Sequence, residues 1–154
     1  MNLGLVRSIA DLSSRWRSRF LPSRASLRPQ HLRRGAQGET LACRFLRRKG
    51  YKILYRNFKG HSVGEIDVVC RDKDTLVFVE VKTRTREDFG RPIAAVDRQK
   101  QKRISRGGLN WLRMLDNPDI LFRFDVVEVV IAEGASPRLE LIKNAFPLSK
   151  PYIY

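Results

Sequence analysis

Charged side chains interrupt two apolar segments of this chain at positions where a β-strand pattern would call for apolar residues. A Gly-Glu-Ile-Asp segment contains Glu65 and Asp67, and a valine-rich segment further along contains Glu80 and Lys82. Because successive side chains of a strand point to opposite faces, the two charges of each segment share one face. Carboxylates on neighbouring strands, with an ammonium group beside them, are suited to bind a divalent cation and to act on a phosphate group.

A polar segment between the two runs determines how they pair. Residues 71–74 (Arg-Asp-Lys-Asp) have the composition of a hairpin turn, so the runs are predicted to be antiparallel neighbours. A turn of two or four residues places Asp67 opposite Glu80, and Glu65 then faces Lys82. Directly opposed Cβ atoms lie about 4.5–5.5 Å apart, which allows two carboxylates to bind one cation. A turn with an odd number of residues and no bulge would separate Asp67 from Glu80, so the prediction depends on the turn.

Two interpretations of these charges are open from the residues alone. Mg²⁺ usually takes one or two protein carboxylates and fills its other positions with water and phosphate oxygens, so the acid pair fits a metal site. Alternatively, Glu80 and Lys82 form a solvated ion pair that contributes only about 0–1 kcal/mol. Apolar residues on both faces of the second run favour the metal site, because a buried charge is costly unless it is paired or bound to a metal.

The ordered motifs resemble the signature of the PD-(D/E)xK nuclease superfamily, which includes restriction enzymes and archaeal Holliday junction resolvases. Further matches extend over about residues 35–132 and resemble the bacterial YraN family. The matching positions are Gly38-Glu39, Gly50-Tyr51 with Asn57, Phe89-Gly90, Trp111-Leu112 and the run Arg123-Phe124-Asp125-Val126-Val127.

The resemblance implies a role for each charged residue. Asp67, Glu80 and Lys82 would be the catalytic residues. Glu39, Asp67 and Glu80 would be the metal ligands, although a charge effect at a helix N-terminus is an alternative for Glu39. Glu65 would be an accessory residue, either as an extra ligand or as a salt-bridge partner of Lys82. The implied cofactor is Mg²⁺ or Mn²⁺, and the implied activity is endonucleolytic hydrolysis of phosphodiester bonds in DNA, including branched or damaged DNA.

The composition favours a nucleic acid as partner. The 154 residues include 31 Lys and Arg against 16 Asp and Glu, a formal net charge of +15, and basic residues that neutralise phosphates gain affinity by releasing counterions. DNA is favoured over RNA by the resemblance, which also implies a homodimer. A nucleic-acid-binding module that uses the same scaffold without cutting is the alternative function. The predicted nucleic-acid contacts are Arg84, Arg86, Arg91, Arg98, Lys102 and Arg103.

The two ends of the chain are predicted to lie outside the domain, which spans residues 35–146. Residues 1–34 form a basic extension, flexible or amphipathic, and residues 147–154 form a C-terminal tail. Apolar residues recur at helical spacing over residues 3–20, so this part could associate weakly with a membrane surface, and its composition also matches a transit peptide. No stretch approaches the ~20 apolar residues of a transmembrane helix, and the expected location is the cytoplasm.

Hydrophobic periodicity predicts the order of the remaining elements. A helix over residues 38–49 precedes a strand over residues 51–58 and the hairpin described above. A second helix, over residues 93–115, has Val96, Lys100 and Ile104 on one face and a weak point at Gly107-Gly108. A long strand at 121–132, with Asp125 paired to Arg123, and an edge strand at 139–142 complete the domain. The predicted fold is therefore α/β, with a restriction-endonuclease-like core and a central mixed β-sheet flanked by helices.

Overall fold

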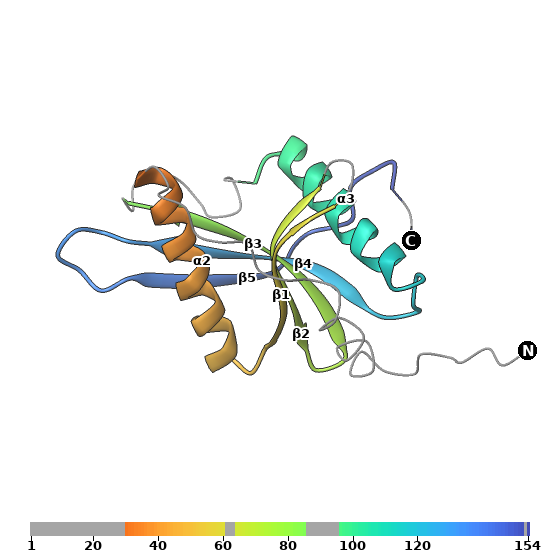
Figure 1. The fold of residues 1–154 in the computed structure, drawn as a ribbon, viewed down its shortest axis with the longest axis horizontal. Helices are drawn as coiled ribbons and strands as arrows, with labels where there is room; N and C mark the ends of the chain where they lie inside the picture. The colour runs from red at the N-terminus through yellow and green to blue at the C-terminus, as the bar shows by residue number, and fades with distance from the viewer. Residues whose placement is uncertain (1–29, 61–63, 86–95, 153) are drawn as a thin grey trace, which may run out of the picture.

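The computed structural model describes residues 30–60, 64–85, 96–152 and 154. The predicted order of helix, three strands, helix and strand is confirmed, and the C-terminal edge strand is longer than predicted (Figure 1). The elements are α2 (Gln30–Arg48), β1 (Lys52–Lys59), β2 (Glu65–Asp72), β3 (Thr75–Arg84), α3 (Arg98–Met114), β4 (Phe122–Val130) and β5 (Arg138–Phe146).

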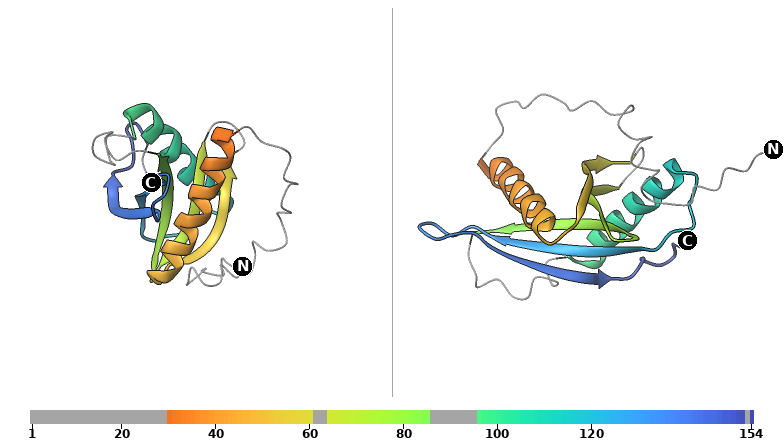
Figure 2. Two further views of the ribbon diagram at one scale, coloured as in Figure 1. Left: turned by 90° about the vertical axis from the view of Figure 1, so that its left-hand side faces the viewer. Right: turned by 90° about the horizontal axis from the view of Figure 1, so that it is seen from below.

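One five-stranded sheet, in the order β1-β2-β3-β4-β5, forms the centre of the molecule. Strands β3 and β4 are parallel and are separated in the chain by α3, whereas the other neighbouring strands are antiparallel. The sheet is therefore mixed, as predicted. Helices α2 and α3 lie on opposite faces of it, which Figure 2 shows end-on.

Each face of the sheet has its own hydrophobic core. The α3 side contains Ile66, Phe78 and Trp111, and the α2 side contains Leu46 and Val79. Both cores are closed to solvent at these positions, with exposed fractions of 1% or less. The two cysteines, Cys43 and Cys70, are buried in the core on the α2 side, and both have free thiols.

Helix α2 begins at Gln30, eight residues before the predicted start at Gly38. Gly38 is therefore inside the helix, and it is the point at which α2 crosses β3. A Cβ atom at Gly38 would lie 1.8 Å from Oγ1 of Thr83, so glycine permits this close approach. The helix-terminus explanation of Glu39 is wrong, because no acidic residue lies in the first turn of α2.

Helix α3 is continuous through Gly107 and Gly108, where the sequence predicted a weak point. Both glycines are buried against the sheet. A Cβ atom at Gly107 would lie 2.8 Å from Cγ1 of Ile66, and one at Gly108 would lie 3.0 Å from Cε2 of Phe78. The two glycines therefore bring α3 close to β2 and β3, and this packing offsets their low helix propensity.

Some of the predictions concern residues outside those that the structure describes. These are the proposed nucleic-acid contacts Arg86 and Arg91 and the amphipathic segment 3–20. Within the described residues, no helix is both long and apolar enough to cross a membrane.

Candidate active site

The hairpin of β2 and β3 has the predicted two-residue turn at Lys73 and Asp74, and the predicted register, with Val68 opposite Val79. The backbone ladder ends at this pair. Beyond it, the N–H of Val81 donates a hydrogen bond to Oδ2 of Asp67 at 2.7 Å. The Asp67 carboxylate therefore bridges the two strands at the point where their backbones stop pairing.

The regular alternation of side chains along β2 is interrupted at Asp67. Val68 packs in the α2-side core, whereas Ile66 packs in the α3-side core, although residues two apart in a regular strand share a face. Asn57 of β1 lies between the residues that pair with Val68 and Ile66, and it has a positive φ of 55°. This left-handed conformation, which asparagine tolerates, accompanies the change of face. Ile66 and Val68, which the alternation of a regular strand predicts on one face of β2, opposite to Asp67, therefore lie on opposite faces of the sheet.

Glu80 is a buried carboxylate held by two lysines. Its Oε1 lies 3.1 Å from Nζ of Lys82 and 3.2 Å from Nζ of Lys100, and the residue is 2% exposed. Its Oε2 is also buried and has no hydrogen-bond partner within the part of the chain that the structure describes. A buried carboxylate oxygen without a partner costs about 1–3 kcal/mol or more, so this atom is an unsatisfied acceptor at the centre of the site.

Asp67 is destabilised as an anion by its surroundings. Burial, and after it the negative charge of Glu80, raise the pKa of Asp67 to about 7. The hydrogen bond from Val81 and the positive charge of Lys100 act in the opposite direction, and Glu39 adds a smaller increase. Two buried carboxylates that repel each other bind a cation readily, because the cation offsets both the cost of burying their charge and their mutual repulsion.

A cavity of about 600 Å³ opens beside the acid pair. It is bounded on one side by residues of α2, including Arg34 and Glu39, and on the other by residues of β2 and β3. A second cavity of about 530 Å³ shares Arg34, Thr83 and Thr85 with it and extends toward the end of β4. The first cavity brings together all four of the predicted catalytic and metal-binding residues: Glu39, Asp67, Glu80 and Lys82.

Glu39 has a different charged partner from the acid pair. Glu39 forms a long ion pair with Arg56 at 3.9 Å. Among the described residues, no group of three or more Asp, Glu, His or Cys side chains lies close enough to hold one metal ion. Glu39 therefore lines the same cavity as Asp67 and Glu80 without forming a three-acid cluster with them in the described residues.

Lys100 is a site residue that the sequence reasoning missed. It lies in the first turn of α3, and its ammonium group contacts Glu80 on the α3 side of the sheet. A signal was present in the sequence, because Lys100 interrupts the apolar face that runs from Val96 to Ile104. The same kind of interruption identified Asp67 and Glu80 in the strands.

Two predicted contacts have other partners in the structure. Glu65 does not pair with Lys82, because the ladder ends before it, and it lies 3.6 Å from Nη2 of Arg103 instead. Arg84 is mostly buried and forms a 2.7 Å ion pair with Glu128 of β4, which leaves its guanidinium directed at protein. Of the remaining predicted nucleic-acid contacts, Arg98 and Lys102 are exposed on α3.

The donor set fits a hard divalent cation. It consists of two adjacent carboxylates with one unsatisfied buried oxygen, and among the described residues that line the cavity none offers a sulfur or imidazole ligand. Mg²⁺ and Mn²⁺ prefer such oxygen ligands and keep several waters, which the cavity can accommodate.

The fold and this acid pair define an α/β domain with a restriction-endonuclease-like core. A family model described as "Uncharacterised protein family UPF0102" matches residues 38–129. The chain belongs to this family, the YraN group of the PD-(D/E)xK-like proteins.

Relatives at high identity cover most of the chain. A UPF0102 protein of Geobacter metallireducens is 48% identical over 115 residues, which are 75% of this chain and 93% of the relative. UPF0102 protein GSU0650 of Geobacter sulfurreducens is 46% identical over 115 residues, 75% and 89% of the two chains. A UPF0102 protein of Syntrophus aciditrophicus is 46% identical over 121 residues, 78% and 93% of the two chains. The names of these relatives state no activity.

Proposed function

We propose that this protein is a Mg²⁺- or Mn²⁺-dependent endonuclease that hydrolyses phosphodiester bonds in DNA, including branched or damaged DNA. The observation that carries the proposal is the buried pair of Asp67 and Glu80, in which Oε2 of Glu80 has no hydrogen-bond partner among the described residues. A folded protein gains nothing from an unsatisfied buried carboxylate, so a cation that satisfies it accounts for its presence.

Each residue of the cavity would have a separate role in the reaction. Asp67 and Glu80 would hold the metal, and Glu39 would orient metal-bound water from the opposite wall. When bound, the metal would polarise the phosphate and lower the pKa of a water ligand. Lys82, which is 3.1 Å from Glu80 and partly exposed to the cavity, would stabilise negative charge on a phosphate oxygen. Lys100 would keep the Glu80 carboxylate oriented from the α3 side.

The net charge of +15 supports a polyanionic substrate. DNA as the substrate and a homodimer as the working form are parts of the same proposal and rest on the resemblance to Holliday junction resolvases. The cytoplasm as the location is a further part of the proposal and fits the two free thiols.

The proposal is tested with purified protein and two measurements. Calorimetric titration with Mn²⁺ measures metal binding, and incubation with branched, single-stranded and duplex DNA measures cutting. We expect Asp67→Ala and Glu80→Ala to lose both, and Lys82→Met to keep metal binding while it loses cutting. Asp74→Ala, in the exposed hairpin turn, is the matched control and should keep both. Cutting that persists equally in Asp67→Ala and Glu80→Ala would refute the proposal.

A nucleic-acid-binding module without catalysis is the second candidate. It is favoured by one observation: both lysines of the site are paired with Glu80, and within the described residues no third acid completes a tight ligand cluster. Wild-type protein that binds DNA but takes up no Mn²⁺ at millimolar concentration would establish this function in place of the nuclease.

A further inference from the structure

The exposed charged side chains that the structure describes on α2 are all basic. Four exposed arginines of α2, together with Lys49 directly after its end, are called the α2 basic face, and the helix contains one acid, Glu39, which lines the cavity beside the acid pair. In the part of the chain that the structure describes, the four arginines of this face have no carboxylate within ion-pair distance. The α2 basic face consists of Arg34, Arg44, Arg47, Arg48 and Lys49.

The α2 basic face starts at the acid pair and leads away from it. Arg34 lines both of the cavities beside Asp67 and Glu80. Arg34 and Arg48 are fourteen residues apart, which corresponds to about 21 Å along a helix at a rise of 1.5 Å per residue. This length matches about six base pairs of a duplex, at 3.4 Å per phosphate along one strand.

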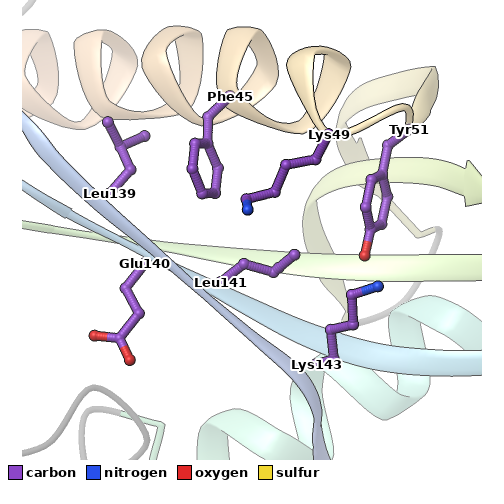
Figure 3. Close-up of a pocket in the computed structure, with 7 residues that line it drawn as sticks. All are labelled: Phe45, Lys49, Tyr51, Leu139, Glu140, Leu141 and Lys143. Atoms are coloured by element: carbon purple, nitrogen blue, oxygen red, sulfur yellow. The ribbon is translucent and has the colours of Figure 1, made fainter.

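The other end of the α2 basic face meets a third hollow, of about 690 Å³, between α2 and β5 (Figure 3). Lys49 and Lys143 both extend into the space between the helix and the strand. The ammonium group of Lys49 lies 4.9 Å from the centre of the Phe45 ring, and that of Lys143 lies 3.3 Å from Asp72. Glu140 also lines this hollow and Lys143 is paired with Asp72, so the hollow is of mixed charge and the α2 basic face ends at Lys49.

The residue types on the α2 basic face indicate which kind of polyanion it can bind. Binding to a membrane surface requires apolar side chains that enter the bilayer, and the large apolar residues that are exposed in the described part, Leu121 and Tyr154, are not on α2. Single-stranded nucleic acids are bound largely by stacking of bases on aromatic rings. Phe45, an aromatic residue of α2, is partly buried and has Lys49 over it. Phosphates of a duplex need neither apolar nor aromatic contacts.

We propose that the α2 basic face binds the phosphate backbone of a duplex, so that the substrate lies along α2 with one end at the acid pair. This inference rests on the proposed function for the position of the cutting site, but the binding itself requires no catalysis. The α2 basic face is a second binding surface, in addition to the basic residues of α3 that the sequence indicated. The form of nucleic acid that it binds is duplex DNA, or a duplex arm of a branched DNA.

The experiment compares two variants with the same loss of charge. Arg44→Ala/Arg47→Ala/Arg48→Ala removes three charges from the α2 basic face. Lys73→Ala/Arg113→Ala/Lys150→Ala removes three exposed charges from other elements. Fluorescence anisotropy with a labelled duplex and a labelled single strand, in EDTA and at several salt concentrations, measures binding without metal or cutting. Mn²⁺ titration and thermal unfolding of both variants establish that the acid pair and the fold are intact.

We expect the α2 variant to bind the duplex at least tenfold more weakly than the wild type at about 0.1 M salt, and the control variant less than threefold more weakly. The slope of log K against log salt should fall by about 2–3 in the α2 variant, because each phosphate contact contributes about 0.9 to it. Equal effects of the two variants would overturn the proposal. If the α2 variant lost single-strand binding as strongly as duplex binding, the proposal would also be overturned. The same holds if anionic liposomes retained the wild-type protein and the duplex did not displace it. Absence of cutting with this binding pattern intact would refute the nuclease and leave the surface assignment standing.

Discussion

Substitution of Asp67 by asparagine should change the pH dependence of stability in the absence of metal. Asparagine has nearly the same shape as aspartate, and its Oδ1 can still accept the hydrogen bond from the N–H of Val81. It carries no charge, so it removes the repulsion with Glu80 and the cost of burying an anion. The comparison therefore isolates the ionisation of one side chain.

The magnitude follows from the pKa of Asp67, which is raised from an ordinary value of 3.8 to about 7. A carboxyl group whose pKa is higher in the folded state costs no stability below its unfolded pKa and costs progressively more as the pH rises toward the folded pKa. At 1.36 kcal/mol per pKa unit, the cost is about 4 kcal/mol at pH 8 and about 1.5 kcal/mol at pH 5. Asp67 is only 8% exposed, so solvent screening reduces these values little.

The assay is urea unfolding of wild type and Asp67→Asn in EDTA at several pH values between 5 and 8. The stability of Asp67→Asn relative to the wild type should increase by about 2–3 kcal/mol from pH 5 to pH 8. Changes that affect both proteins, such as those from the high net charge, cancel in this difference. A difference that stays within about 0.5 kcal/mol across the range would show that Asp67 is not buried against Glu80, and the reasoning for a cation site would fail with it.

Two further predictions concern packing and charge away from the cavity. Gly64→Ala should lower the free energy of unfolding by about 1–3 kcal/mol, because its Cβ atom would lie 2.5 Å from the backbone nitrogen of Gly107. Gly35→Ala is the matched control: no atom lies within 4 Å of its Cβ position, so the better helix propensity should raise stability by about 0.5–1 kcal/mol. Equal urea midpoints for the two variants would contradict the close packing of α3 on β2. Asp125→Ala should cost about 3 kcal/mol, because Asp125 is fully buried and binds Nε of Arg123 at 2.9 Å. A urea midpoint equal to that of the wild type would show that this ion pair contributes nothing.

The sheet and the acid pair were predictable because their signals are local. Residues 71–74 specify a tight turn, and the alternation on either side of the turn then determines the register. The pairing of Asp125 with Arg123 was predictable for the same reason, since residues two apart in a strand share a face.

The start of α2 was not predictable from periodicity. Residues 33–37 of this helix are mostly exposed, so they carry no apolar stripe that would mark them as helical. The partners of Glu65 and Arg84 were missed for another reason. They come from α3 and β4, and the placement of these elements depends on packing between distant parts of the chain.

The candidate site lies where three layers of the molecule meet. Its acid pair comes from the sheet, Glu39 from the helix above it and Lys100 from the helix below it, and each helix is anchored in a separate hydrophobic core. Neither core can shift its helix without altering the distances among these charged groups. The site therefore reports on the packing of the whole domain, and a substitution in the interior that contacts none of its residues, such as one at Leu46 or Trp111, can still change the geometry of the charges.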